Sequence, residues 1–234
     1  MAYSKKEAPN CEWCPYKKSC YYELLGTKEA KRYWKDMRVA NAFKEGQVVF
    51  YEGTKPQGIY VVCKGRVKVY KSSRTGQQLT TRVESPGDLL GHVSFLAQGD
   101  YTSTAEALDP AVVSMVDERT FLNFLVKFPY SAVALLRALA MDVRMGENKA
   151  RDIAFKPARG RLADVLLRMM TPAKPKPVVV GLKRRDLGEM AGLTIETTVR
   201  LLKDFEIRGL LRKKDKDLVI LNEEQLKTIS GAAQ

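Results

Sequence analysis

Residues 178–222 read VVVGLKRRDLGEMAGLTIETTVRLLKDFEIRGLLRKKDKDLVILN. This stretch predicts a short strand, a helix over 184–191, a turn, a second helix over 194–208, and two strands around a charged tip. Gly192 permits the tight turn, Thr194 can cap the second helix, and Gly209 can end it. Together these features predict a helix-turn-helix followed by a wing.

In a helix-turn-helix, the first residues of the second helix meet base edges in the major groove of double-stranded DNA. Arg200 can donate two hydrogen bonds to a guanine, and Glu196 can accept one from a cytosine. The alternative is an ordinary ion pair between these two residues on a helix surface. The expected base-edge positions are Ile195, Glu196, Thr197, Val199 and Arg200, and the expected phosphate contacts are Thr197, Thr198, Lys183, Arg184 and Arg185.

The composition fits a DNA partner. Lys and Arg outnumber Asp and Glu by 40 to 27, and the net charge of +13 would attract a polyanion. No run approaches the roughly 18 apolar residues of a membrane span, and the first residues lack the apolar region of a signal peptide. We therefore expect a cytoplasmic protein with no membrane partner.

Upstream, residues 43–117 contain short β-rich runs separated by turn residues, which predicts an antiparallel sandwich or roll. Helices are expected over 27–38, 118–126, 130–154 and 158–170, with Pro157 ending the long one. The fold class is therefore α+β. We expect a cap over 1–26, a roll over 27–128, a long helix over 129–155 and the DNA-binding domain over 156–234.

The long helix carries an apolar stripe at three- and four-residue steps. The stripe predicts a seam between two copies of the chain, the alternative being a helix that lies on the roll. The expected dimerisation residues are Val133, Leu136, Leu139, Ala140 and Val143.

Three of the four cysteines, Cys11, Cys14 and Cys20, fall within ten residues, and the fourth is Cys63. In a reducing cytosol this clustering favours a metal or redox site over structural disulfides. Residues 1–26 show no helical or alternating periodicity, so we expect a ligated metal, rather than a core, to hold the cap. With one histidine and no catalytic motif, the chain is not expected to be an enzyme.

Residues 11–222 resemble the Crp/Fnr family of bacterial transcription regulators. The resemblance rests on FKEGQVVFYEG, GIYVVCKGRVKVYK, PGDLLGHVSFLAQGD, GRLADVLL and RRDLGEMAGLTIETTVRLLKDFEIRGLL. It implies a cyclic-nucleotide-binding-like jelly roll, a dimerisation helix and a winged helix-turn-helix, in this order. It also implies a homodimer that binds a pseudo-palindromic operator and contacts RNA polymerase.

The resemblance also bears on individual residues. The family reads bases with a glutamate and an arginine four residues apart, which implies those roles for Glu196 and Arg200. The Fnr branch has serine just before that arginine, and Val199 stands here, so one base of the half-site should differ. Cyclic-AMP-binding members carry Gly-Glu-Leu and Arg-Ser stretches where this chain has Gly91-His92-Val93 and Thr102-Ser103, so cyclic AMP is not the expected ligand.

The spacing Cys11-x2-Cys14-x5-Cys20 matches the Fnr-type cluster motif, and three such thiolates can hold three corners of a [4Fe-4S] cluster. In Fnr proteins the fourth cysteine lies late in the roll, where the best-aligned residue here is Ser114. We expect Cys63 to replace it, the alternatives being an aspartate, His92 or no protein ligand. Structural zinc, or haem held by Cys63 and His92, are the other candidate cofactors.

The expected function is a DNA-binding regulator whose dimerisation and DNA affinity are switched by an oxygen- or nitric-oxide-sensitive iron–sulfur cluster. The alternative is an effector- or haem-responsive regulator of the same family, with structural zinc or without an iron–sulfur cluster.

Overall fold

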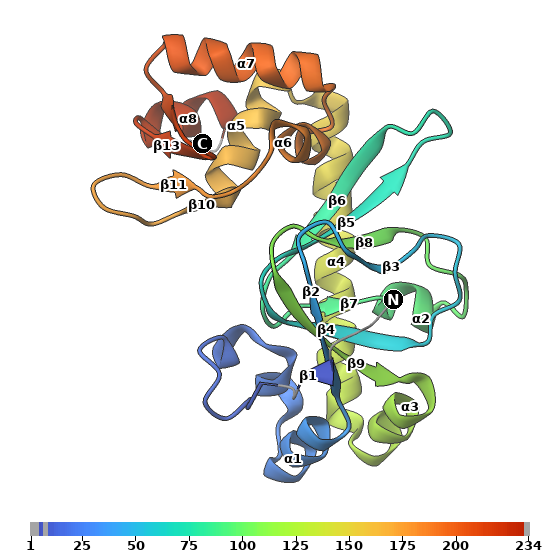
Figure 1. Cartoon of the computed structure of the whole chain (residues 1–234). Coiled ribbons are helices and arrows are strands. Elements are labelled where there is room, and N and C mark those ends of the chain that lie inside the picture. The colour runs from blue at the N-terminus through green and yellow to red at the C-terminus, as the bar shows by residue number, and fades with distance from the viewer. Residues whose placement is uncertain (1–4, 7–8, 232–234) are drawn as a thin grey trace. The chain divides into compact units, whose positions relative to one another are not determined.

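The structure is a computed structural model that describes residues 5–6 and 9–231. Residues 1–8 of the expected cap therefore fall largely outside the described residues, as do residues 232–234 of the expected C-terminal domain. The chain divides into two compact units, residues 1–73 with 81–145 and residues 74–80 with 146–234 (Figure 1).

The elements up to the long helix are those of an antiparallel roll flanked by helices. They are β1 (Lys5–Lys6), η1 (Lys17–Ser19), η2 (Tyr21–Leu25), α1 (Lys28–Asp36), β2 (Val39–Phe43), β3 (Val48–Phe50), β4 (Gly58–Lys64), β5 (Val67–Ser72), β6 (Gln78–Glu84), β7 (Leu89–Leu90), α2 (His92–Leu96), β8 (Thr104–Ala107), β9 (Ala111–Asp117), α3 (Glu118–Lys127) and α4 (Pro129–Phe155).

The strands form a five-stranded sheet in the order β1-β2-β9-β4-β7 and a four-stranded sheet in the order β3-β8-β5-β6. Buried side chains of both sheets, such as Phe43, Tyr60, Val67 and Ala105, make one core. The predicted antiparallel roll is therefore confirmed. The sequence prediction missed β2 and extended the first helix to residue 38, whereas α1 ends at Asp36.

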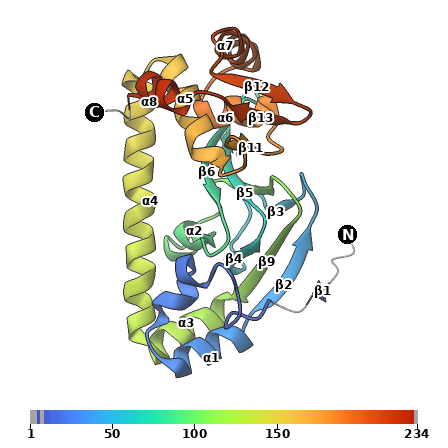
Figure 2. The same cartoon turned by 90° about the vertical axis from the view of Figure 1, so that its left-hand side faces the viewer.

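A second core lies where α1, α3 and the start of α4 meet (Figure 2). Trp34 of α1 is fully buried and packs against Phe121 and Phe124 of α3, while Ala134 and Leu135 come from α4. Thr27 caps α1 by accepting a hydrogen bond from the Ala30 N–H at 3.1 Å.

The C-terminal elements are a helix-turn-helix with a hairpin. They are α5 (Ala158–Met169), β10 (Met170–Thr171), β11 (Val178–Val179), α6 (Arg184–Ala191), α7 (Ile195–Ile207), β12 (Leu211–Lys214), β13 (Asp217–Ile220) and α8 (Glu223–Ser230), with a sheet in the order β10-β11-β13-β12.

The predicted turn chemistry of this domain is confirmed. Helix α6 ends at Gly192, whose φ of 62° is left-handed, and Thr194 caps α7 by accepting from the Thr197 N–H at 3.2 Å. Phe205, Leu187 and Leu162 are buried between the helices, which fixes α7 by its apolar face and leaves its other face exposed.

Among the described residues, no single helix is long and apolar enough to cross a membrane. Helices α3 and α4 reach that length and composition only together, as a pair bent by 114°.

Candidate cysteine pocket and nucleic-acid interface

The N-terminal segment packs into the second core. Tyr21, Tyr22 and Leu25 are 3%, 4% and 1% exposed, and the Tyr21 hydroxyl donates to the backbone oxygen of Ser131 in α4 at 2.7 Å. The expectation that this segment lacks a core was wrong. Its buried side chains lie in short 3-10 turns, which leave no helical or alternating pattern in the sequence.

All four cysteines line one pocket. Cys11, Cys14 and Cys20 come from the segment before α1, and Cys63 comes from β4 of the roll. The pocket holds about 340 Å³ of empty space, part of it open to solvent. Two segments that are distant in sequence thus bring every thiol of the chain to one place.

A β-bulge positions Cys63. Strand β4 pairs with β9 at Val62 opposite Val113 and at Lys64 opposite Val112, which leaves Cys63 as the extra residue between them. Such a residue is unpaired and its side chain is re-aimed. The Cys63 sulfur lies 3.3 Å from the Ser114 hydroxyl oxygen, so Cys63 stands beside the position where the resemblance places the family's fourth cysteine.

Gly87 keeps the third cysteine close to the roll. A Cβ atom at Gly87 would lie 2.8 Å from Cα of Cys20 and 2.9 Å from the Ser19 carbonyl oxygen, and the φ of Gly87 is 108°. The Tyr21 N–H donates to the Gly87 carbonyl oxygen at 3.2 Å. Only glycine permits this approach of the two backbones.

Arg38, between α1 and β2, reaches into the same pocket and is only 7% exposed. Its Nη2 lies 2.8 Å from the Cys11 sulfur, while its Nη1 lies 3.7 Å from the Cys63 sulfur and 3.3 Å from the Ser114 oxygen. Arg38 was not predicted as a site residue, since a single arginine between a helix and a strand belongs to no motif that reveals where its side chain points.

The thiols interact with one another. The pKa of Cys20 is raised to about 11, mainly by burial; the neighbouring Cys11 and Cys63 contribute to the rise, and a hydrogen bond with the Tyr22 backbone opposes it. Burial also raises the pKa of Cys11, against the opposing charge of Arg38. Cys20 is therefore protonated at neutral pH unless a bound cation replaces its proton.

The described residues contain no group of three or more His, Cys, Asp or Glu side chains already arranged around one metal ion. The pocket does offer the right ligand type, because thiolates are the usual ligands of iron–sulfur clusters and of structural zinc. The donor set and the guanidinium beside it therefore fit an anionic, thiolate-ligated group.

His92 is not among the residues that line the cysteine pocket. It is 2% exposed, its Nε2 lies 3.1 Å from the Asp142 carboxylate of α4, and Arg82 contacts the same oxygen. Burial, with the charge of Arg82, lowers the pKa of His92 to about 4, so the imidazole is neutral. The predicted haem ligands Cys63 and His92 are thus engaged with different partners.

Aromatic side chains occupy part of the roll interior. The rings of Phe50 and Tyr101 stack with centroids 3.9 Å apart, and Tyr60 lies 5.6 Å from Phe50. Lys68 of β5, next to the core residues Val67 and Val69, is also buried, and its Nζ lies 3.5 Å from the Glu106 carboxylate.

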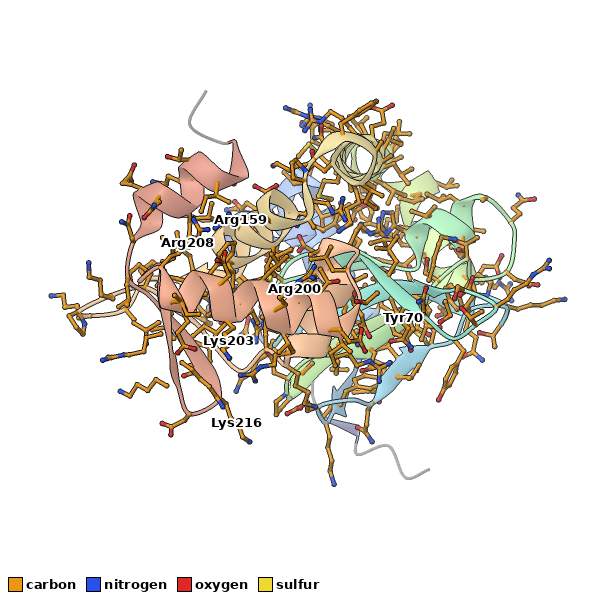
Figure 3. All side chains as sticks on the ribbon, turned by 90° about the horizontal axis from the view of Figure 1, so that it is seen from above. Tyr70, Arg159, Arg200, Lys203, Arg208 and Lys216 are labelled. Carbon is orange, nitrogen blue, oxygen red and sulfur yellow. The ribbon has the colours of Figure 1, made fainter. Side chains whose placement is uncertain are left out.

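The exposed face of α7 carries the predicted base-reading residues. Ile195 and Val199 are 49% and 43% exposed, and Glu196 and Arg200 are also exposed. Within the described part of the chain, Glu196 and Arg200 form no ion pair, so the helix-surface pairing considered from sequence is not present. Figure 3 shows Arg200 and Lys203 on α7 and Lys216 at the tip of the β12–β13 hairpin.

The prediction that Thr198 contacts a phosphate was wrong. Thr198 is fully buried, and its hydroxyl donates to the Thr194 carbonyl oxygen at 2.8 Å, so it cannot contact a phosphate from this position. The other predicted phosphate contacts, Lys183, Arg184, Arg185 and Thr197, are exposed or half-buried, and Arg185 pairs with Glu189 at 2.7 Å.

The predicted dimerisation stripe lies on α4 away from its buried face. The buried residues are Ser131, Ala134 and Leu135, whereas Leu136 and Val143 are 62% and 61% exposed. The remaining stripe residues are Val133 and Ala140, which are exposed, and Leu139, which is half-buried.

These features define a class of protein, in which an antiparallel roll is followed by a long helix and a winged helix-turn-helix. Comparison with known proteins agrees. The model of the cyclic nucleotide-binding domain matches residues 40–128, and that of the Crp-like helix-turn-helix domain matches residues 160–229. Together these two matches cover more than half of the chain.

Relatives span most of the sequence. The fumarate and nitrate reduction regulatory protein of Escherichia coli (strain K12) is 24% identical over 229 residues, 96% of this chain and 91% of the relative. The CRP-like cAMP-activated global transcriptional regulator of Mycobacterium tuberculosis (strain ATCC 25618 / H37Rv) is 26% identical over 189 residues, 79% and 84% respectively. The structure of FixK2 from Bradyrhizobium japonicum has a TM-score of 0.73 at 25% identity, covering 84% of this chain and 99% of that one.

The chain belongs to the Crp/Fnr family of transcription regulators. It is therefore a Crp/Fnr-type DNA-binding transcription regulator.

Proposed function

We propose that this regulator is a homodimer whose DNA affinity is switched by an iron–sulfur cluster of the [4Fe-4S] type, sensitive to oxygen or nitric oxide. Cys11, Cys14, Cys20 and Cys63 would hold the cluster. The observation that carries the proposal is that all four cysteines of the chain line one pocket, beside a buried guanidinium. Four thiolates are the usual ligand set of such a cluster.

When bound, the cluster supplies a redox-active group that reacts with oxygen or nitric oxide. The residues of the chain connect the cysteine pocket to α4, the proposed dimerisation helix. Cys20 is followed directly by Tyr21, whose hydroxyl holds the backbone of Ser131 in α4, and Tyr22 and Leu25 pack into the same core as Leu135. A change in how the cap is held therefore changes what packs against the start of α4.

The exposed stripe on α4 supports the homodimer. A long apolar stripe on one side of a helix is the seam that a second copy would cover. Two copies of α7 can reach two half-sites about one DNA turn apart, roughly 34 Å, only when the dimer holds them at that spacing. A change in the packing of α4 would thereby alter DNA affinity.

The cofactor is tested by purifying the protein without oxygen, recording its visible spectrum, and assaying iron, sulfide and zinc before and after air is admitted. The proposal predicts matched iron and sulfide and a broad absorption that bleaches in air. A colourless protein with stoichiometric zinc would instead support an effector-responsive regulator with structural zinc, and a sharp Soret band would support haem. Either result would refute the cluster.

The identity of the fourth ligand is tested by moving the cysteine from position 63 in β4 to position 114 in the neighbouring strand β9. We expect Cys63→Ser to lose most of the cluster, and the double variant Cys63→Ser/Ser114→Cys to regain it, because the two side chains lie 3.3 Å apart. The matched control is Cys63→Ser/Ser94→Cys, since Ser94 is a buried serine of the roll that does not line the pocket. Full iron and sulfide in Cys63→Ser would rule out Cys63 as a ligand.

A further inference from the structure

Arg38 is a buried cation without a carboxylate partner. It is 7% exposed, and among the described residues no Asp or Glu lies within ion-pair distance of its guanidinium. Its Nε has no hydrogen-bond partner there either. Burying a guanidinium without an opposite charge is costly, so the fold must place negative charge beside it in the working protein.

The groups that do face Arg38 are sulfur atoms and a hydroxyl. One nitrogen contacts Cys11 of the N-terminal segment, and the other lies between Cys63 and Ser114 of the roll. The planar fork of the guanidinium lets one side chain reach both segments at once. A metal-ligated thiolate is anionic, which is the charge that the guanidinium lacks.

We infer that Arg38 is the counter-cation and positioning residue of the cysteine site. It donates hydrogen bonds to the sulfur atoms of Cys11 and Cys63, offsets part of the negative charge of the thiolate-ligated group, and ties the N-terminal segment to the roll. This inference rests on the proposed cluster. It adds that the chain sets the reduction potential of its cofactor with a residue that is not a ligand.

The potential is the property that separates this role from a purely structural one. A positive charge and hydrogen bonds at the sulfurs favour the more negative, reduced state of a cluster and so raise its reduction potential. Removing them should lower the potential even where the fold and the ligands are intact. A residue that only fills space would not shift the potential in this direction.

The test compares the wild type with Arg38→Gln, Arg38→Lys and the control Lys18→Gln, which removes an exposed cation from the same segment. Each protein is purified without oxygen, its fold is checked by circular dichroism, and its iron, sulfide and midpoint potential are measured. We expect a more negative potential in Arg38→Gln, a smaller shift in Arg38→Lys and none in Lys18→Gln. A folded Arg38→Gln that binds no cluster, with binding restored in Arg38→Lys, also supports the positioning role.

If Arg38→Gln does not fold, Arg38→Lys tests the inference in its place. One lysine nitrogen cannot donate to both sulfurs, so the midpoint potential of the Arg38→Lys protein should fall below that of the wild type. Wild-type potential and full cluster content in the folded Arg38 variants would overturn the inference and leave the proposed function standing. A wild-type protein without iron and sulfide would overturn both, so the two failures are distinguishable.

Discussion

Glu84 shows how a single buried residue makes stability depend on pH. It is 5% exposed at the end of β6, and burial raises the pKa of its carboxyl to about 7, with Arg82 at 3.0 Å opposing the shift and Asp88 adding to it. Between pH 4.5 and 7 the folded chain keeps a proton that the unfolded chain releases. The free energy of unfolding therefore falls as pH rises through this window.

We expect Glu84→Gln to flatten this dependence and to raise the free energy of unfolding at pH 8 by about 3 kcal/mol, with little change at pH 4.5. Urea unfolding followed by tryptophan fluorescence measures this free energy, since Trp34 is fully buried in the unit that contains Glu84. The exposed Glu52→Gln is the control. Equal pH slopes in Glu84→Gln and the wild type would show that Glu84 is not the group responsible.

Arg200 is exposed near the start of α7 and pairs with no carboxylate in the described chain. Replacing it with alanine should cost about 1–3 kcal/mol of binding to the preferred duplex and relax the choice at one base pair. Fluorescence anisotropy with a duplex selected from a random library, and with its single-base variants, measures both effects.

Arg208→Ala is the control for Arg200, because Arg208 directly follows the last residue of the same helix and is held by Asp204 at 2.9 Å. If Arg200→Ala weakened all duplexes equally, Arg200 would be a phosphate contact rather than a base-reading residue.

Among the elements, α4 has an exposed apolar stripe that a second copy would cover. Placing a charge on it by Leu136→Glu should convert the dimer to a monomer, because an unpaired carboxylate cannot be buried at the seam. Light scattering after size-exclusion chromatography measures the mass. Leu122→Glu, at an exposed leucine of α3, is the matched control, and a dimeric Leu136→Glu protein would place the seam elsewhere.

Elements whose pattern is local were predictable from the sequence. Helix α6 occupies the residues expected of it, and Thr194 and Gly192 act as the cap and turn that their chemistry implies. The burial of Tyr21 and Thr198 was not predictable, because it depends on segments distant in sequence or on the rotation of a helix against its neighbour. The bulge at Cys63 was hidden for the same reason, since an extra residue in a strand is defined by its partner strand.

The residues of the candidate site also divide into those that could be predicted from the sequence and those that could not. The three cysteines before α1 were found from their spacing, and Cys63 was expected to join them, whereas the presence of Arg38 beside them is a product of the fold. No sequence pattern marks Arg38 as part of the cysteine site, because its place there depends on its charge and its position in the fold rather than on a repeated spacing.

At the scale of the whole molecule, the proposed switch requires that the state of the cysteine site changes DNA affinity. Couplings between two sites in proteins are typically 5- to 150-fold in affinity. The structural link is the contact of Tyr21 with Ser131, which joins the segment that carries three cysteines to the helix that carries the exposed stripe.

The most direct measurement is the dissociation constant for a duplex selected by the anaerobic protein, determined by fluorescence anisotropy before and after air, with iron and sulfide assayed in the same samples. If the cluster is the switch, the dissociation constant of the wild type changes by about tenfold or more as the cluster is lost, and that of Cys63→Ser does not change on exposure to air. Equal dissociation constants in wild-type samples that have kept and lost the cluster would contradict the proposed switch.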